Sequence, residues 1–148
     1  MPIAHSTAEA RWSGDLIEGG GTVRSGSGAF PEMPISWSRR TQREQGATSP
    51  EELIAAAHSS CFCMAFSNEL ARAGHPAERI VTAASVAFDT GRPGGAAITS
   101  IDLEVRARVP GIDGAAFQAA AEAARAGCPV SKALAGVEIR LRASLETG

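Results

Sequence analysis

The sequence lacks both a strongly basic segment and a long apolar run, the features typical of nucleic-acid-binding and membrane-spanning proteins. Its 148 residues carry a formal net charge of −2, and basic residues are interspersed with acidic ones. The short cluster Arg39, Arg40 and Arg43 is broken, so the sequence lacks the basic stripe that binds nucleic acid. No apolar run approaches the roughly 20 residues needed to cross a bilayer. We therefore expect neither a nucleic-acid partner nor a membrane partner.

Cysteine is scarce too, and this limits the role of disulfides. The three cysteines, Cys61, Cys63 and Cys128, are too few for a structural disulfide framework. The first residues lack the charged head and apolar stretch of a signal peptide, so we expect a soluble, cytoplasmic protein. In a reducing compartment, a disulfide is more often transient and catalytic than structural. With 44% hydrophobic residues, no internal repeat and no long linker, residues 1–148 are predicted to form a single globular domain.

The hydrophobic pattern predicts strands, then a helix, strands, a helix and a strand. Residues 98–109 and 137–145 alternate apolar with polar side chains, which is typical of antiparallel strands with one face in water. The other predicted elements are strands at 8–12, 22–25, 35–38 and 80–88, a glycine turn at 19–21, a helix at 114–126 and a short helical turn from 128 to about 134. The order indicates an α+β domain.

The most clearly marked element is a long helix in the first half of the chain. Ser49 is a good N-cap, Pro50 suits the first helical position, and Glu52 completes a capping box. Helix-forming residues continue to Gly74, a natural C-cap. Because the middle of this segment has almost no charge, we expect the helix to be buried, with antiparallel sheet around it.

Two cysteines lie in different settings, and together they suggest redox chemistry. Cys61 lies within the long helix, where a free cysteine is commonly a small core residue. Cys128 precedes Pro129 at a predicted helix start, where free N–H groups favour a thiolate, although it also fits a plain cap position. One thiol could attack a substrate and the other resolve the product. For each residue the structural interpretation stays open at this point.

Neighbouring residues offer further alternatives. Cys63 points about 200° away from Cys61 around the helix and is best read as core. His58 could form a nucleophilic pair with Cys61, or a metal site with Cys61 and Cys128. Since no C-x-x-C or H-x-x-x-H spacing is present, a buried, hydrogen-bonded core histidine is favoured, and we expect no metal.

A carboxylate and two arginines complete the set of candidates. Capping explains Glu52 but leaves Glu51 less well explained. Arg39 and Arg40 follow a predicted strand and could pair with Glu51. An arginine next to a cysteine lowers the thiol pKa and can orient a peroxide oxygen by hydrogen bonds.

Several segments of the chain resemble one known family. The segments TSPEELIAAAHSSCFCMAFS, VPGIDGAAF and AGCPVSKAL, with ARWSGDLIEGGGTV earlier in the chain, resemble the osmotically inducible protein C / organic hydroperoxide resistance (OsmC/Ohr) family over nearly the whole length. The GCPVS box preceded by VPGID is closer to the osmotically inducible branch. The resemblance implies an OsmC-like fold, with antiparallel sheets wrapped around a long buried central helix in an intertwined homodimer. It also implies a thiol-dependent peroxidase with no metal and no cofactor.

The family's functional residues map onto this sequence one by one. The peroxidatic cysteine falls on Cys61, the resolving cysteine on Cys128, and the glutamate on Glu51, the first Glu of PEEL. The arginine falls within SWSRRTQ, with Arg40 the preferred match and Arg39 the alternative. The family position that is often serine is Cys63 here, a potential third, minor thiol.

The resemblance implies a reaction and its partners. Organic hydroperoxides, and less efficiently hydrogen peroxide, would be reduced through a Cys61 sulfenic acid and a Cys61–Cys128 disulfide in oxidative or osmotic stress defence. A dithiol, such as a lipoyl-type thiol, would be the reductant. A non-catalytic stress or ligand-binding protein, a thiol redox sensor, and a hydrolase using Cys61 with His58 are the alternatives.

Helix geometry adds a constraint on how the site is assembled. Glu51 and Cys61 lie ten residues apart on one helix, which is about 15 Å of rise. A Glu51–arginine pair therefore cannot reach Cys61 of the same chain. We expect it to come from a partner subunit across a two-fold axis.

Overall fold

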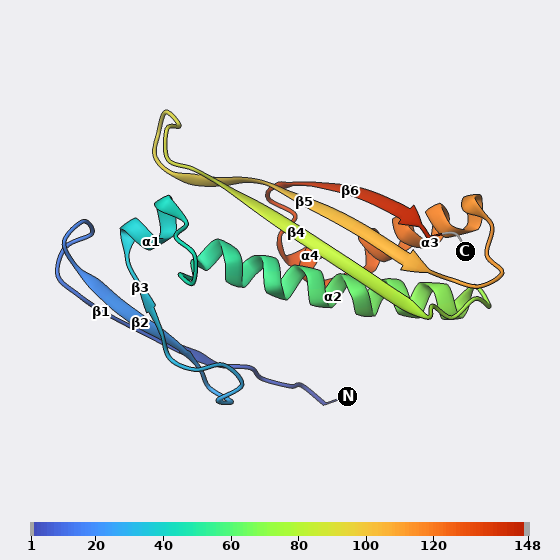
Figure 1. Ribbon diagram of the computed structural model, residues 1–148, viewed down its shortest axis with the longest axis horizontal. Coiled ribbons are helices and arrows are strands. Elements are labelled where there is room, and N and C mark those ends of the chain that lie inside the picture. Colours follow the sequence, from blue (N-terminus) through green and yellow to red (C-terminus); the bar gives the residue numbers. More distant parts are fainter. Residues whose placement is uncertain (1, 147–148) are drawn as a thin grey trace. The chain divides into compact units, whose positions relative to one another are not determined.

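The computed structural model describes residues 2–146 and divides into two compact units, Met1–Pro50 and Glu51–Gly148 (Figure 1). The first unit holds strands β1 (Ala8–Ser13), β2 (Gly20–Ser25) and β3 (Met33–Ile35) and helix α1 (Trp37–Gln42). The second holds helix α2 (Pro50–Arg72, which starts at the last residue of the first unit), strands β4 (Arg79–Asp89), β5 (Ala97–Arg108) and β6 (Glu138–Leu145), and helices α3 (Gly114–Gly127) and α4 (Pro129–Ala133).

In the first unit, β1, β2 and β3 form an antiparallel sheet in that order. The predicted turn at residues 19–21 is wrong, because Gly20 and Gly21 belong to β2 and the turn lies at residues 16–18. A Cβ at Gly21 would lie 1.8 Å from the carbonyl oxygen of Arg11 on the paired strand. The glycine therefore permits close strand pairing.

The predicted strand at residues 35–38 is also wrong beyond its first residue. β3 ends at Ile35, and α1 begins at Trp37. The Ser36 side chain accepts a hydrogen bond from the Arg39 amide at 3.2 Å, which is the geometry of a helix N-cap. The local cap chemistry of Ser36 thus starts a helix where the apolar pattern suggested a continuing strand.

In the second unit, β4, β5 and β6 form one sheet, and α2 runs along it (Figure 1). β4 and β5 are an antiparallel hairpin, as predicted, but β6 pairs parallel with β5. The expectation of a purely antiparallel sheet is wrong here because α3 and α4 carry the chain back across the sheet between β5 and β6, and such a crossover produces parallel strands.

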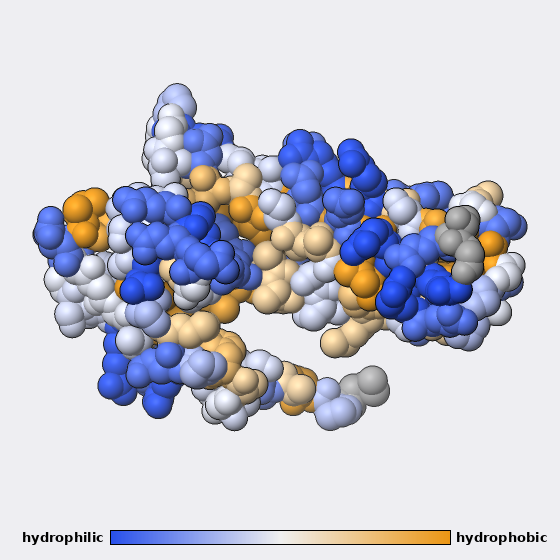
Figure 2. Space-filling model, viewed as in Figure 1, coloured by the Kyte–Doolittle hydropathy of each residue, from blue (hydrophilic) through white to orange (hydrophobic). Residues whose placement is uncertain are grey.

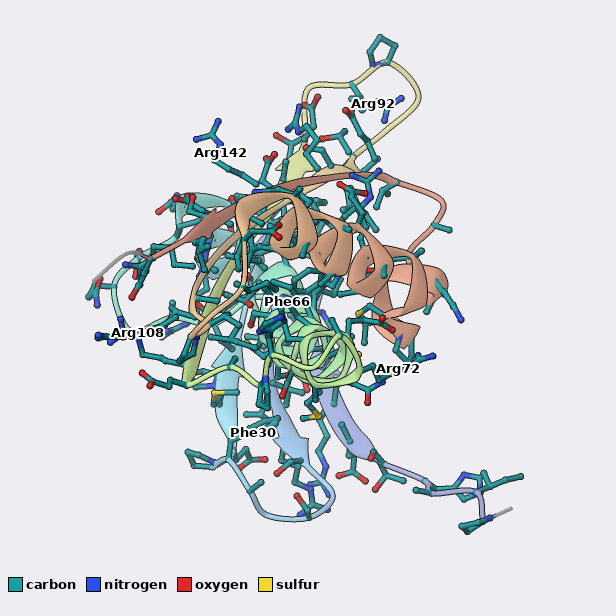
Figure 3. The ribbon with its side chains drawn as sticks, turned by 90° about the vertical axis from the view of Figure 1, so that its right-hand side faces the viewer. Phe30, Phe66, Arg72, Arg92, Arg108 and Arg142 are labelled. Carbon is teal, nitrogen blue, oxygen red and sulfur yellow. The ribbon has the colours of Figure 1, made fainter. Side chains whose placement is uncertain are left out.

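The core of this unit lies between the sheet and the helices. Phe66 of α2 packs against Phe117 of α3 edge to face, with 5.3 Å between ring centroids, and Figure 3 looks nearly along α2 with Phe66 directed into the interior. The fully buried aromatic and aliphatic side chains include Phe62, Phe66, Leu70, Ile101, Val105 and Phe117. Charged side chains of β5 and β6 alternate outward, and Figure 2 has hydrophilic residues gathered above these two strands. The α+β class with a long central helix is confirmed.

One face of α2 is open within the single chain. The residues His58, Phe62, Phe66 and Leu70 recur every four positions and are buried. The opposite face is small and nearly uncharged, and Met64 on it is 71% exposed. The prediction of a buried helix therefore holds for one face only, because the sheet and α3 cover one side. Among residues 2–146, no helix has the length and apolar character needed to cross a membrane.

Candidate active site

The central feature of the second unit is a close pair of sulfur atoms. Cys61 projects from the middle of α2, and Cys128 is the N-cap residue of α4. The Cys128 amide donates to the Ala124 carbonyl of α3 at 2.8 Å, which fixes the start of α4 against the end of α3. The two Sγ atoms lie 3.4 Å apart, although 67 positions separate the residues. A small movement would bring them to disulfide distance.

The two thiols differ in their exposure. Cys128 is fully buried, whereas Cys61 is partly exposed. A substrate arriving from solvent therefore meets Cys61 first. This asymmetry suits an attacking thiol at Cys61 and a shielded second thiol at Cys128.

The electrostatic environment of the chain also separates the two thiols. Burial alone would raise the pKa of the Cys128 thiol, but interactions with the amide and hydroxyl of Ser131, with Cys61 and with the Val130 amide outweigh it, and the pKa is lowered. Burial raises the pKa of the Cys61 thiol, and the neighbouring Cys128 adds to this, against a lowering by the Val130 amide. Within one chain, negative charge is therefore favoured on Cys128.

His58 contacts Ser131, a neighbour of the second thiol. It is fully buried, and its Nε2 lies 2.7 Å from the hydroxyl oxygen of Ser131, which is also buried. Burial lowers the pKa of His58. The interpretation of His58 as a buried, hydrogen-bonded histidine is confirmed, and its ring bonds to Ser131 in place of a cysteine, so no Cys–His nucleophilic pair is formed. Among residues 2–146, no group of three or more His, Cys, Asp or Glu side chains is placed so that it could hold a metal ion.

Ser131 is a site residue that the sequence analysis did not single out. It lies three residues after Cys128, one helical turn along α4. The signal was available in the GCPVS box, since a serine three residues after a cysteine at a helix start faces that cysteine. The GCPVS box had been interpreted only for its cysteine.

Cys63 points elsewhere, as its spacing predicts. Its Sγ lies 3.1 Å from the Thr82 hydroxyl on β4, and it lines a groove with residues that include Met64 and Ile80. Its sulfur therefore packs on the sheet, away from the Cys61–Cys128 pair.

The predicted carboxylate and arginines lie in different units. Glu51, in the first turn of α2, is 6% exposed. Arg40, on α1, lines a small pocket of about 120 Å³ with Trp12, Leu16 and Trp37, all within the first unit. Arg39 is not among the residues that line this pocket. An apolar pocket that contains a guanidinium suits a polar group attached to an apolar chain.

Comparison with known proteins agrees with this arrangement. The family described as OsmC-like protein matches residues 43–142, about two thirds of the chain. The chain is 44% identical to a protein named peroxiredoxin OsmC from Escherichia coli (strain K12), over 130 residues that cover 88% of this chain and 90% of that protein.

The chain belongs to the OsmC family.

Solved structures share the fold of this chain. An organic hydroperoxide resistance protein OsmC from Legionella pneumophila has a TM-score of 0.71 at 22% identity, covering 99% of this chain and 100% of that chain. An organic hydroperoxide resistance protein from Elizabethkingia anophelis, with thiocyanate bound, has a TM-score of 0.72 at 25% identity over the same shares. The predicted family is thereby confirmed, and the name of the Escherichia coli relative supports the predicted enzyme class, a cysteine-based peroxidase.

Proposed function

We propose that this OsmC-family chain is a thiol-dependent peroxidase that reduces organic hydroperoxides, and less efficiently hydrogen peroxide, in oxidative or osmotic stress defence. The observation that carries the proposal is the 3.4 Å separation of the Cys61 and Cys128 sulfur atoms, one partly exposed and one buried. Both units, residues 1–148, are proposed to act together as one OsmC-like domain, and a cytoplasmic location remains a prediction.

The reaction follows from the two thiols. The Cys61 thiolate attacks the distal oxygen of the hydroperoxide, an alcohol or water leaves, and Cys61 becomes a sulfenic acid. Cys128 then condenses with it, forming a disulfide and releasing water. A dithiol reductant, proposed to be of the lipoyl type, restores both thiols by exchange.

Cys61 needs help to become a thiolate, because its own chain raises its pKa. A guanidinium next to the sulfur would reverse this. We assign that role to Arg40, held in place by Glu51, and the apolar pocket around Arg40 favours it over Arg39. Since helix rise puts Glu51 about 15 Å from Cys61, the pair must come from a partner subunit of an intertwined homodimer. The open, uncharged face of α2 supports contact between two copies.

The thiol chemistry is tested by mass spectrometry of non-reduced peptides after an equimolar dose of an organic hydroperoxide. We expect a Cys61–Cys128 link in the native chain. Cys61→Ser should abolish peroxide consumption, whereas Cys128→Ser should allow one oxidation and then stall or overoxidise at Cys61. Cys63→Ser is the matched control and should form the same link. Full turnover by Cys61→Ser would refute the proposal.

The subunit assignment has its own test. Light scattering should give a dimer at micromolar concentration. Cys61→Ser and Arg40→Gln should each be inactive alone, but co-expression should recover activity, because hybrid dimers contain one intact site. Arg39→Gln is the control for Arg40→Gln and should retain most activity. Hybrids without activity would show that Cys61 and Arg40 act within one chain.

Thiol counting distinguishes the peroxidase from an inert protein, and repeated doses of peroxide distinguish it from a sensor. An inert protein keeps all three thiols free after a stoichiometric dose of peroxide, whereas the proposed peroxidase loses two. A sensor loses the same two, but it does not consume repeated doses when a dithiol is supplied.

A further inference from the structure

A buried polar chain runs from α2 to the second thiol. His58 Nε2 lies 2.7 Å from the Ser131 hydroxyl oxygen, and both residues are buried. Ser131 lies one helical turn after Cys128 on α4, and its hydroxyl and amide are both among the groups that lower the pKa of the Cys128 thiol. Nothing in the peroxidase mechanism above uses His58 or this hydroxyl.

The hydrogen on the imidazole can be placed by a satisfaction argument. His58 Nδ1 is buried and has no hydrogen-bond partner among the described residues. A buried N–H without an acceptor is rarer than a buried lone pair without a donor, so the neutral ring carries its hydrogen on Nε2. Nε2 then donates to the Ser131 oxygen. The serine hydrogen is left free to point at the Cys128 sulfur.

We propose that His58 is a positioning residue for the resolving thiol: it holds the Ser131 hydroxyl as a hydrogen-bond donor to Cys128, which favours the Cys128 thiolate. The inference deepens the proposed peroxidase function and rests on it. Burial keeps His58 neutral by lowering its pKa, so no proton needs to be transferred to the ring. The His58 N–H polarises the Ser131 hydroxyl, which strengthens the hydrogen bond that the hydroxyl donates to the Cys128 sulfur.

The step that this arrangement serves is disulfide formation. The Cys128 thiolate attacks the sulfur of the Cys61 sulfenic acid, which the hydroperoxide has already oxidised. The S–S bond forms as the S–O bond breaks, and the leaving hydroxide takes a proton from solvent to become water. Two cysteine sulfurs are thereby joined, with the hydroperoxide as the only oxidant.

Few other groups could stabilise the Cys128 thiolate in the same way. The titratable side chain that acts on Cys128 is Cys61 of α2, and His58 lies one hydrogen bond further away through Ser131. On α4 and the end of α3, the nearest charged residues in sequence, Lys132 and Arg125, are exposed. A shift in Cys128 ionisation on changing His58 therefore reports the Ser131 relay.

The first experiment does not depend on peroxidase activity. In the Cys61→Ser, Cys63→Ser double variant of the full chain, Cys128 is the only thiol, and its ionisation is followed by thiolate ultraviolet absorbance. We expect Ser131→Ala to move this titration to higher pH. His58→Asn, whose amide stops short of the Nε2 position, should move it in the same direction. His58→Gln, whose amide nitrogen reaches about that position, should leave it near the parent value.

The second experiment measures disulfide formation in single turnover with native cysteines, by rapid quenching and mass spectrometry. A hydrogen bond to an ionised group changes an equilibrium about tenfold, so Ser131→Ala should lower the Cys128 thiolate fraction about tenfold at neutral pH. The more basic thiolate is also more nucleophilic, which leaves a net slowing of about threefold. At high pH, where all thiols are ionised, the variant should become the faster one. His58→Asn should show the same crossing with a smaller amplitude.

The double variant separates the relay from a purely structural role of His58. If the ring acts through the Ser131 hydroxyl, His58→Asn should have no further effect on either readout in the Ser131→Ala background. An unchanged Cys128 titration in His58→Asn would overturn the inference. So would an effect of equal size with and without Ser131. If no Cys61–Cys128 disulfide forms at all, the peroxidase proposal fails, while the titration still decides the relay.

Discussion

Oxidation should stabilise the second unit by an amount that the chain separation sets. A Cys61–Cys128 disulfide closes a loop of 67 residues. Loop-closure entropy for that length is worth about 4 kcal/mol in free energy of unfolding. The two sulfurs start 3.4 Å apart, so α4 has to move little to make the bond, and strain should remove only part of this gain. We expect the disulfide form to be about 2–4 kcal/mol more stable than the dithiol form.

Urea unfolding at a fixed protein concentration measures this difference, with the chain oxidised by an equimolar organic hydroperoxide or kept reduced by a dithiol. For a chain of this size, the same gain should raise the melting temperature by about 4–16 °C. Cys128→Ser, treated in the same way, should gain nothing, and Cys63→Ser should gain as much as the native chain. A disulfide form that unfolds at the same urea concentration as the dithiol form would show that bond formation distorts the fold.

Three further predictions test packing, strand pairing and protonation. Phe66→Ala, at a fully buried position, should lower the free energy of unfolding by about 3–5 kcal/mol in urea titrations. Gly21→Ala should disrupt the sheet of the first unit, seen as faster proteolysis within residues 1–50, because its Cβ would meet the Arg11 carbonyl at 1.8 Å; unchanged proteolysis would contradict the close pairing. Because burial lowers the pKa of His58 below its ordinary 6.5, the unfolded chain binds more protons, so stability should fall as pH drops below about 6.5, and His58→Gln should flatten that fall in urea midpoints.

Much of the fold was predictable from local signals. Ser49, Pro50 and Glu52 predicted the start of α2, and the alternation in residues 98–109 and 137–145 predicted β5 and β6. What local patterns cannot convey is pairing direction: a strand alternates in the same way whether its neighbour is parallel or antiparallel. The parallel partner of β6 follows from the crossover by α3 and α4, which is a property of topology.

The candidate site was predictable in part, for a similar reason. Cys61 and Cys128 were named from their settings and from the family resemblance, but their 3.4 Å approach depends on how α4 docks on α2. Ser131 was missed because serine is common and its value comes from His58, a residue distant in sequence. His58 was correctly interpreted as a buried core residue. Its contact with Ser131, which carries the proposed positioning role, could not be predicted from a sequence pattern.

The parallel pairing of β6 also affects biosynthesis. The β4–β5 hairpin closes through a short local connection, whereas β6 can join only after α3 and α4 have crossed the sheet. Cys128 lies at the start of α4, so it leaves the ribosome 67 residues after Cys61. A nascent chain therefore passes through a stage in which Cys61 has been synthesised and Cys128, the other half of the 3.4 Å sulfur pair, has not.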